Sequence, residues 1–138
     1  MTDPKREEIR LWLLKSRQDL AVAELLIEQQ HAYLGIAVYH CQQSVEKGLK
    51  AYLTHHDVLF KKTHDLTVLT RLCMEFDERF EALLDAAEVL TPYATQFRYP
   101  SDQVEPDKIE AENALTLSSE ALAFIQNALS KNLLLTDL

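Results

Sequence analysis

The most informative part of this sequence is the stretch Tyr39-His40-Cys41-Gln42-Gln43-Ser44-Val45-Glu46-Lys47-Gly48-Leu49-Lys50-Ala51-Tyr52-Leu53. At about 100° per residue, an apolar stripe follows one side of a helix that includes it, formed by Leu34, Val38, Cys41, Val45, Leu49 and Tyr52. A polar stripe lies beside it, formed by Tyr39, Gln43, Glu46 and Lys50. The stretch therefore predicts a long helix with one buried side and one polar side. The polar side faces plain water, the rim of a cleft or a partner surface.

Length and composition predict a single all-α domain that covers residues 1–138. A chain of 138 residues has the usual size of one domain and can bury its own core. It contains only two glycines and four prolines, and it lacks the alternating β-branched runs that are typical of strands. Because the helical segments are joined by short connections, we expect an antiparallel bundle of four or five helices.

Start and stop signals divide the chain into helical segments. We expect helices from Thr2 or Asp3 to about Gln29, from about Ala32 to His55, from a cap at Thr63 to Leu90 with a break near Asp77, from Thr91-Pro92 to Arg98, and from Pro106 onward. The apolar tail Leu133-Leu134-Leu135 is expected either to pack on the bundle or to form a subunit contact.

Charge and composition limit the function classes. The formal charge of −8 and the pI of about 5.0 argue against binding of duplex DNA. The two cysteines, Cys41 and Cys73, lie in apolar helical settings, so we expect reduced, buried thiols. Ligand spacings for a metal are missing, and no cofactor is expected. The polar segment Met1–Glu8 and the lack of a run of roughly 20 apolar residues predict a cytoplasmic protein without a membrane span.

Three motifs resemble those of the HEPN family, and they occur in the family's order between about residues 10 and 125. The first is Asp19-Leu20-x-x-Ala23-x-Leu25-Leu26, followed by Tyr33 and by Tyr39-x-x-Gln42-Gln43-x-x-Glu46-Lys47-x-Leu49-Lys50-Ala51-x-Leu53. The second is Thr63-His64-Asp65-Leu66-x-x-Leu69, and the third is Arg98-Tyr99-Pro100. Each motif is weak by itself, but together they identify the chain as similar to HEPN domains.

The resemblance implies a helical bundle like that of nucleotidyltransferase substrate-binding subunits. It implies further that the protein is a homodimer and that its partner is a minimal nucleotidyltransferase. It also implies nucleotide or RNA binding. One branch of the family consists of metal-independent ribonuclease toxins with an Arg-x4-6-His motif. None of the six arginines here is followed by a histidine at that spacing, and Arg98 is followed by Tyr99-Pro100-Ser101-Asp102-Gln103-Val104-Glu105. We therefore expect a non-catalytic partner or nucleotide-binding protein in a toxin–antitoxin-like system.

We predict that the polar stripe and the last two motifs share one groove and form the contact surface. Its residues are Tyr39, Gln43, Glu46, Lys50, His64, Asp65, Arg98 and Tyr99. Glu46 and Lys50 are spaced for a helical ion pair, worth about 0.2–0.5 kcal/mol if exposed. The alternative is that Lys50 binds a phosphate while Tyr39 and Gln43 contact a base or a partner side chain.

The other two motifs also have structural interpretations. His64 and Asp65 are consistent with a helix start, and Arg98 is consistent with stacking on neighbouring aromatic rings. A different function class is a divergent ribonuclease, in which Arg98 binds the phosphate and His64 carries the proton. A third class is a self-associating scaffold with no ligand.

Overall fold

The computed structural model describes residues 3–100 and 104–131, and every secondary-structure element within these ranges is a helix or a helical turn. The elements are α1 (Pro4–Glu24), the π-helical turns η1 (Leu25–Gln30), α2 (Leu34–His55), α3 (Leu66–Met74), the 3-10 helix η2 (Glu78–Leu83), α4 (Leu84–Leu90), the 3-10 turn η3 (Thr91–Ala94) and α5 (Lys108–Ser130). The predicted all-α bundle is confirmed.

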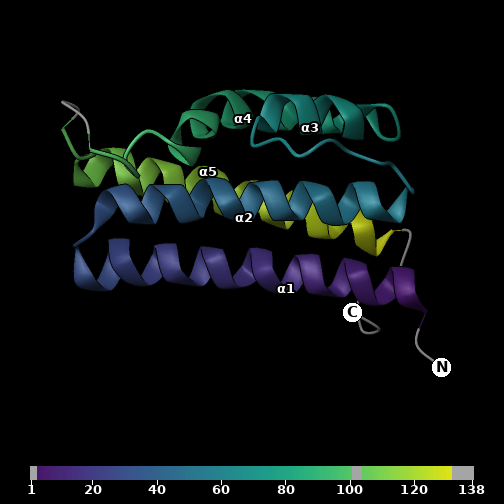
Figure 1. The fold of residues 1–138 in the computed structure, drawn as a ribbon, viewed down its shortest axis with the longest axis horizontal. Coiled ribbons are helices and arrows are strands. Elements are labelled where there is room, and N and C mark those ends of the chain that lie inside the picture. Colours follow the sequence, from purple (N-terminus) through teal and green to yellow (C-terminus); the bar gives the residue numbers. More distant parts are fainter. Residues whose placement is uncertain (1–2, 101–103, 132–138) are drawn as a thin grey trace.

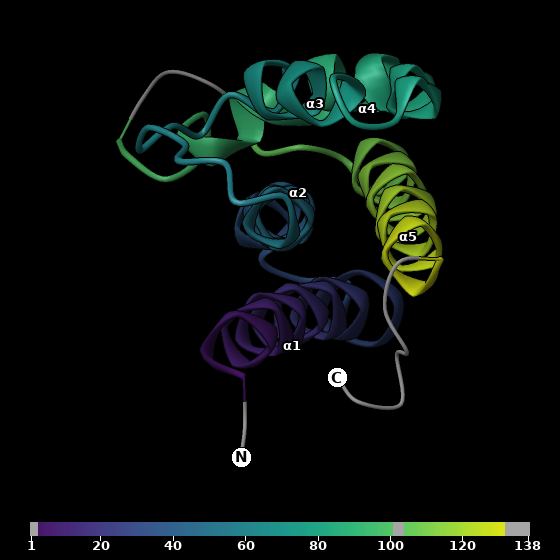
Figure 2. The same cartoon turned by 90° about the vertical axis from the view of Figure 1, so that its right-hand side faces the viewer.

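Helix α2 lies at the centre of the molecule. Helix α1 runs antiparallel to it, and α5 runs in the same direction as α2 (Figure 1). Seen end-on, α1 lies below α2, α5 lies to one side, and α3 and α4 lie above (Figure 2). Two connecting segments, residues 56–65 and 95–100, pass near the remaining side of α2, and the predicted site residues outside α2 belong to these segments.

The predicted break after the first helix is confirmed, although no glycine marks it. His31 and Tyr33 both adopt left-handed backbone conformations, with φ of 50° and 55°. Such a conformation is uncommon for residues other than glycine, and it stops a right-handed helix. Because Tyr33 is left-handed, α2 begins at Leu34 and not at Ala32.

Two further predicted helix starts are wrong by two residues. Asp65, not Thr63, caps α3, since its Oδ1 accepts the backbone N–H of Thr67 at 2.9 Å. Asp107 caps α5 by accepting the N–H of Glu110 at 2.8 Å, so the helix begins at Lys108 and not at Pro106. In both cases a carboxylate stands next to the first helical residue, where it can accept an unpaired N–H and face the positive end of the helix dipole.

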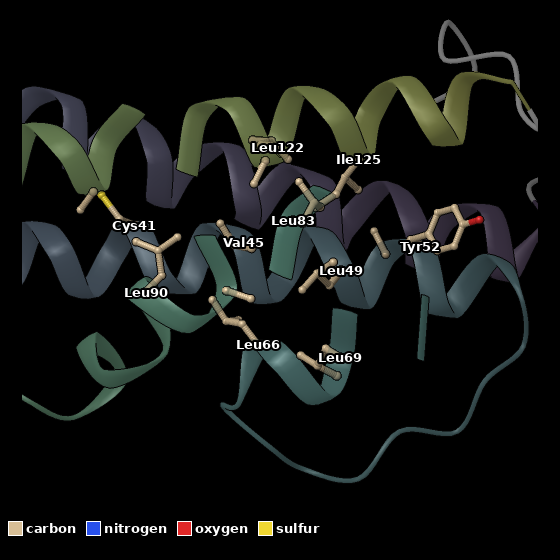
Figure 3. Close-up of a cluster of buried hydrophobic side chains, with 14 of the residues drawn as sticks. Cys41, Val45, Leu49, Tyr52, Leu66, Leu69, Leu83, Leu90, Leu122 and Ile125 are labelled. Carbon is tan, nitrogen blue, oxygen red and sulfur yellow. The ribbon is translucent and has the colours of Figure 1, made fainter. Parts of the chain in front are cut away.

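The predicted apolar stripe of α2 forms the core. Figure 3 shows its side chains pointing toward those of α3, α4 and α5 and of the 3-10 helix before α4. The labelled members are Cys41, Val45, Leu49, Tyr52, Leu66, Leu69, Leu83, Leu90, Leu122 and Ile125, and all are buried. A Cβ on Gly48 would lie 3.2 Å from Ile125 Cδ1 and 3.3 Å from Leu122 Cδ1, so this glycine permits the close approach of α5.

Both cysteines are free and buried. Burial raises the pKa of Cys41 to about 11 and raises that of Cys73 as well. They are therefore protonated, unreactive core residues, as predicted.

Among the described helices, none is long and apolar enough to cross a membrane. The tail Leu133–Leu135, for which a packing or subunit contact is predicted, lies outside the described residues.

Candidate functional site

The polar stripe of α2 is largely buried. Only 8% of Gln43, 4% of Glu46 and 7% of Lys50 is exposed, while Tyr39 is half-buried. Burial of polar groups costs free energy unless each group finds a hydrogen-bonding partner. The hydrogen-bonding partners of these side chains therefore decide which groups of the stripe remain available to a ligand.

Glu46 is the centre of a hydrogen-bond network. Its Oε1 accepts hydrogen bonds from Nδ1 of His64 at 2.8 Å and from Nε2 of Gln42 at 3.1 Å. Its Oε2 accepts from Nζ of Lys50 at 3.0 Å. Gln42 Nε2 also donates to the backbone carbonyl of His64 at 2.9 Å. The network therefore fastens the connection between α2 and α3 to the polar side of α2.

Lys50 forms the predicted ion pair with Glu46, but in a buried setting and not on the surface. Its ammonium nitrogen also lies 5.6 Å from the ring centroids of Trp12 and Phe60. A buried ammonium group between a carboxylate and two aromatic faces is well stabilised. The charge of Lys50 is thus directed into the protein.

His64 is the exposed end of this network, since 58% of its side chain is accessible. With Nδ1 donating to Glu46, its Nε2 is the nitrogen left for solvent or a ligand. Its neighbour Asp65 has a structural role as the cap of α3. Hydrogen bonds from Thr67 hold the pKa of the Asp65 carboxyl below its ordinary value.

Arg98 stacks on Tyr39 of the polar stripe, about two helical turns before Glu46. Its guanidinium carbon lies 4.4 Å from the ring centroid of Tyr39 and 5.7 Å from that of Tyr99. Arg98 and Tyr99 are exposed, so Arg98 is stacked and accessible at the same time. Tyr39 and Glu46 are seven residues apart on α2, which places the Arg98 and His64 contacts about 10 Å apart along the helix axis.

The structure therefore brings the three predicted segments together on one side of α2. His64 joins the buried network at Glu46, whereas Arg98 and Tyr99 meet α2 at Tyr39, and all three side chains are accessible. Within residues 3–100 and 104–131, no group of three or more His, Cys, Asp and Glu side chains could hold a metal ion.

Sequence reasoning missed a second network beside the first. The carboxylate of Asp19 on α1 accepts from Nδ1 of His40 at 2.8 Å and from Nζ of Lys47 at 2.7 Å. Burial alone would raise the pKa of Asp19, but the hydrogen bonds from His40 and Lys47 outweigh it and lower the pKa. The available signal was that His40 and Lys47 are seven residues apart, on the same side of a helix.

Glu46→Gln should destabilise the protein by about 3–5 kcal/mol, because the buried charge of Lys50 loses its partner. Burial raises the pKa of Glu46, but hydrogen bonds from His64, Lys50 and Gln42 outweigh this and lower it below the ordinary 4.5. The stabilising effect of the ionised Glu46 is therefore complete above pH 4.5 and is lost as the pH falls through the pKa of Glu46 in the folded protein, which lies below 4.5.

Urea unfolding at a series of pH values checks this prediction. Wild type should lose stability in acid more steeply than Glu46→Gln. The exposed Glu88→Gln on α4 is the matched control and should follow wild type. Parallel curves for wild type and Glu46→Gln would contradict the role of an ionised Glu46.

Comparisons with known proteins agree with this fold. The family model of the HEPN domain matches residues 9–128. The candidate toxin MJ1304 of Methanocaldococcus jannaschii is 26% identical over an alignment of 136 positions that covers 88% of this chain and 88% of that protein. The crystal structure of TT1696 from Thermus thermophilus has a TM-score of 0.75 at 26% identity, covering 86% of this chain and 96% of that one. ST0689, an archaeal HEPN homologue, shares the fold with a TM-score of 0.68 at 19% identity, over 87% and 96% of the chains. This chain belongs to the HEPN domain family.

Proposed function

We propose that the protein is a non-catalytic member of a toxin–antitoxin-like pair whose partner is a minimal nucleotidyltransferase. It would bind this partner, or a nucleotide or RNA that the pair shares, with the side of α2 that carries His64, Arg98 and Tyr99. The similarity to a candidate toxin supports a role in a toxin–antitoxin-like pair. The resemblance of the three motifs to the HEPN family supports a minimal nucleotidyltransferase as the partner. The homodimer that the resemblance implies stays a prediction.

The observation that carries this proposal is the convergence of two distant segments on one rigid helix. His64 is fixed by Glu46, and Arg98 is fixed by stacking on Tyr39. Arginine and tyrosine are enriched among the residues that dominate the binding energy of interfaces. Side chains held on a helix lose little freedom on binding, so a partner gains more from contacting them.

A non-catalytic role is supported by the chain around Arg98. No histidine follows it at the spacing of four to six residues that the ribonuclease branch uses. Lys50, the other cation of the predicted site, already has its charge balanced by Glu46. The predicted contact of Lys50 with a phosphate would require this ion pair to open.

Co-purification tests the proposed partner. A nucleotidyltransferase encoded beside this gene should co-purify with the tagged protein, and the double variant Arg98→Ala, Tyr99→Ala should weaken the complex about tenfold or more. Arg79→Ala is the control, because Arg79 is an exposed arginine on η2 that pairs with Asp77. Absence of any such complex, or equal weakening by the control, would contradict the proposal.

A ribonuclease that uses Arg98 and His64 is the second candidate. The observation in its favour is the hydrogen bond between His64 Nδ1 and Glu46, which directs Nε2 to the exposed side. A carboxylate that orients an imidazole in this way is common to many general bases. Arg98 would then stabilise the phosphate charge.

Incubation with tRNA and mRNA separates the two candidates. The proposed non-catalytic role predicts intact RNA with wild type at protein concentrations in excess of the RNA. Cleavage that is lost in both His64→Gln and Arg98→Ala would instead establish the ribonuclease. Cleavage that persists in both variants would indicate a contaminating nuclease.

A further inference from the structure

A groove crosses one end of the bundle, from the first half of α1 over the α2–α3 connection to α3. It consists of three hollows of about 260, 540 and 430 Å³. Glu8 lines both the first and the second, and Leu59 and Phe60 line both the second and the third, so the hollows are continuous. The connection that forms the middle of the groove lies on the side of α2 away from α5 (Figure 2).

The groove lies apart from the stacked arginine of the candidate site. It reaches α2 at Thr54, near the end of that helix. Tyr39, on which Arg98 stacks, lies 15 residues earlier on the same helix. At 1.5 Å per residue, this separation is about 22 Å along the helix axis. A ligand of the groove is therefore a separate question from a ligand of Arg98.

The aromatic part of the groove floor is fixed in place. The rings of Trp12 and Phe60 meet edge to face, with their centroids 6.3 Å apart. The buried ammonium nitrogen of Lys50 lies 5.6 Å from each centroid, so both rings pack on a buried charge as well as on each other. Side chains that are already immobile lose little freedom on binding, so a ligand gains more from contacting them.

Aliphatic side chains extend this floor toward solvent. Leu59 is 100% exposed, Val68 is 46% exposed and Leu11 is 44% exposed, and each lines one or two of the hollows. Single exposed apolar side chains are normal on a protein surface, but a group of them around a groove is typical of an interaction site. Leu59 is the clearest case, because its side chain contributes no burial to the fold.

The groove is basic, although the protein has a net charge of −8. Four of the eight lysines line it, against two acids, and these six residues are Lys5, Lys15, Lys61, Lys62, Glu8 and Asp57. Lys5 pairs with Asp57 at 3.1 Å. Among the ion pairs of the described residues, none includes Lys15, Lys61 or Lys62. Carboxylates of a bound partner would therefore meet three ammonium groups without an ion-pair partner.

We infer that this groove binds an acidic segment of a partner protein, with large apolar side chains on the floor and carboxylates beside Lys61 and Lys62. A second copy of this chain fits less well, because a two-fold contact brings the same lysines toward each other. A nucleic acid strand also fits less well, because the aliphatic part of the floor offers no face for stacking bases and Glu8 repels phosphates. The inference does not depend on a nucleotidyltransferase as the partner.

A library of short random peptides, displayed on phage and selected on the purified wild-type protein, tests the inference. Selected peptides should be enriched in Asp and Glu together with Leu, Ile and Phe, relative to the unselected library. Trp12 is the only tryptophan of the chain and lines the groove, so synthetic selected peptides without tryptophan should change its emission as they bind. Enrichment of neutral or basic peptides, or of none, would overturn the inference.

Substitutions at the groove give a second readout with the selected peptides. Leu59→Ser should weaken their binding about tenfold or more, equivalent to a loss of about 1.4 kcal/mol. Its urea midpoint should equal that of wild type, because Leu59 is fully exposed. The double variant Lys61→Glu, Lys62→Glu should weaken binding as much, and wild-type binding should weaken as the salt concentration rises. Lys108→Glu on α5 is the matched control outside the groove and should stay within about twofold of wild type. Equal binding by Leu59→Ser and wild type would contradict the inference.

Other occupants of the groove give different results in the same fluorescence assay. Emission of Trp12 that changes with protein concentration alone, together with a dimer in sedimentation, indicates a second copy. A change of this emission in a variant that ends at Lys131 indicates residues 132–138 of the chain. A short single-stranded RNA that changes the emission, where the selected peptides do not, indicates a nucleic acid. Each of these results would rule out an acidic partner segment as the occupant.

Discussion

The buried carboxylate of Glu46 is the interaction on which the functional side of this protein depends. It accepts a hydrogen bond from the imidazole of His64, in the connection between α2 and α3, and neutralises Lys50. A buried charge without a partner costs several kcal/mol, so these groups can only be buried together. Because Gln42 binds both Glu46 and the carbonyl of His64, the position of the loop before α3 follows from the same network.

The helices could be predicted because their cause is local. The apolar stripe of α2 and the break after α1 follow from periodicity and the short connection, and both are present. The sequence does not decide whether Thr63 or Asp65 caps α3, because a hydroxyl and a carboxylate are both good caps. The burial of the polar stripe could not be predicted, because Trp12 and Phe60, whose rings lie against Lys50, come from distant parts of the chain.

The same limit explains which part of the candidate site was predicted. His64 and Arg98 could be predicted because family motifs mark them, and in the structure both contact residues of α2. The pairing of Asp19 with His40 was missed because it joins two helices, and their relative rotation cannot be read from either helix alone. The hydrogen bond between His40 and Asp19 therefore follows only from the packing of α1 against α2.

Each of the two networks holds an imidazole against α2, and Arg98 stacks on Tyr39 of the same helix. The account depends most on Glu46 being ionised in the folded protein. A titration of its side-chain carboxyl carbon by ¹³C NMR measures this directly. The account predicts a midpoint below the ordinary value of 4.5, because the hydrogen bonds from His64 and Lys50 outweigh burial. A midpoint at or above 4.5 would contradict it.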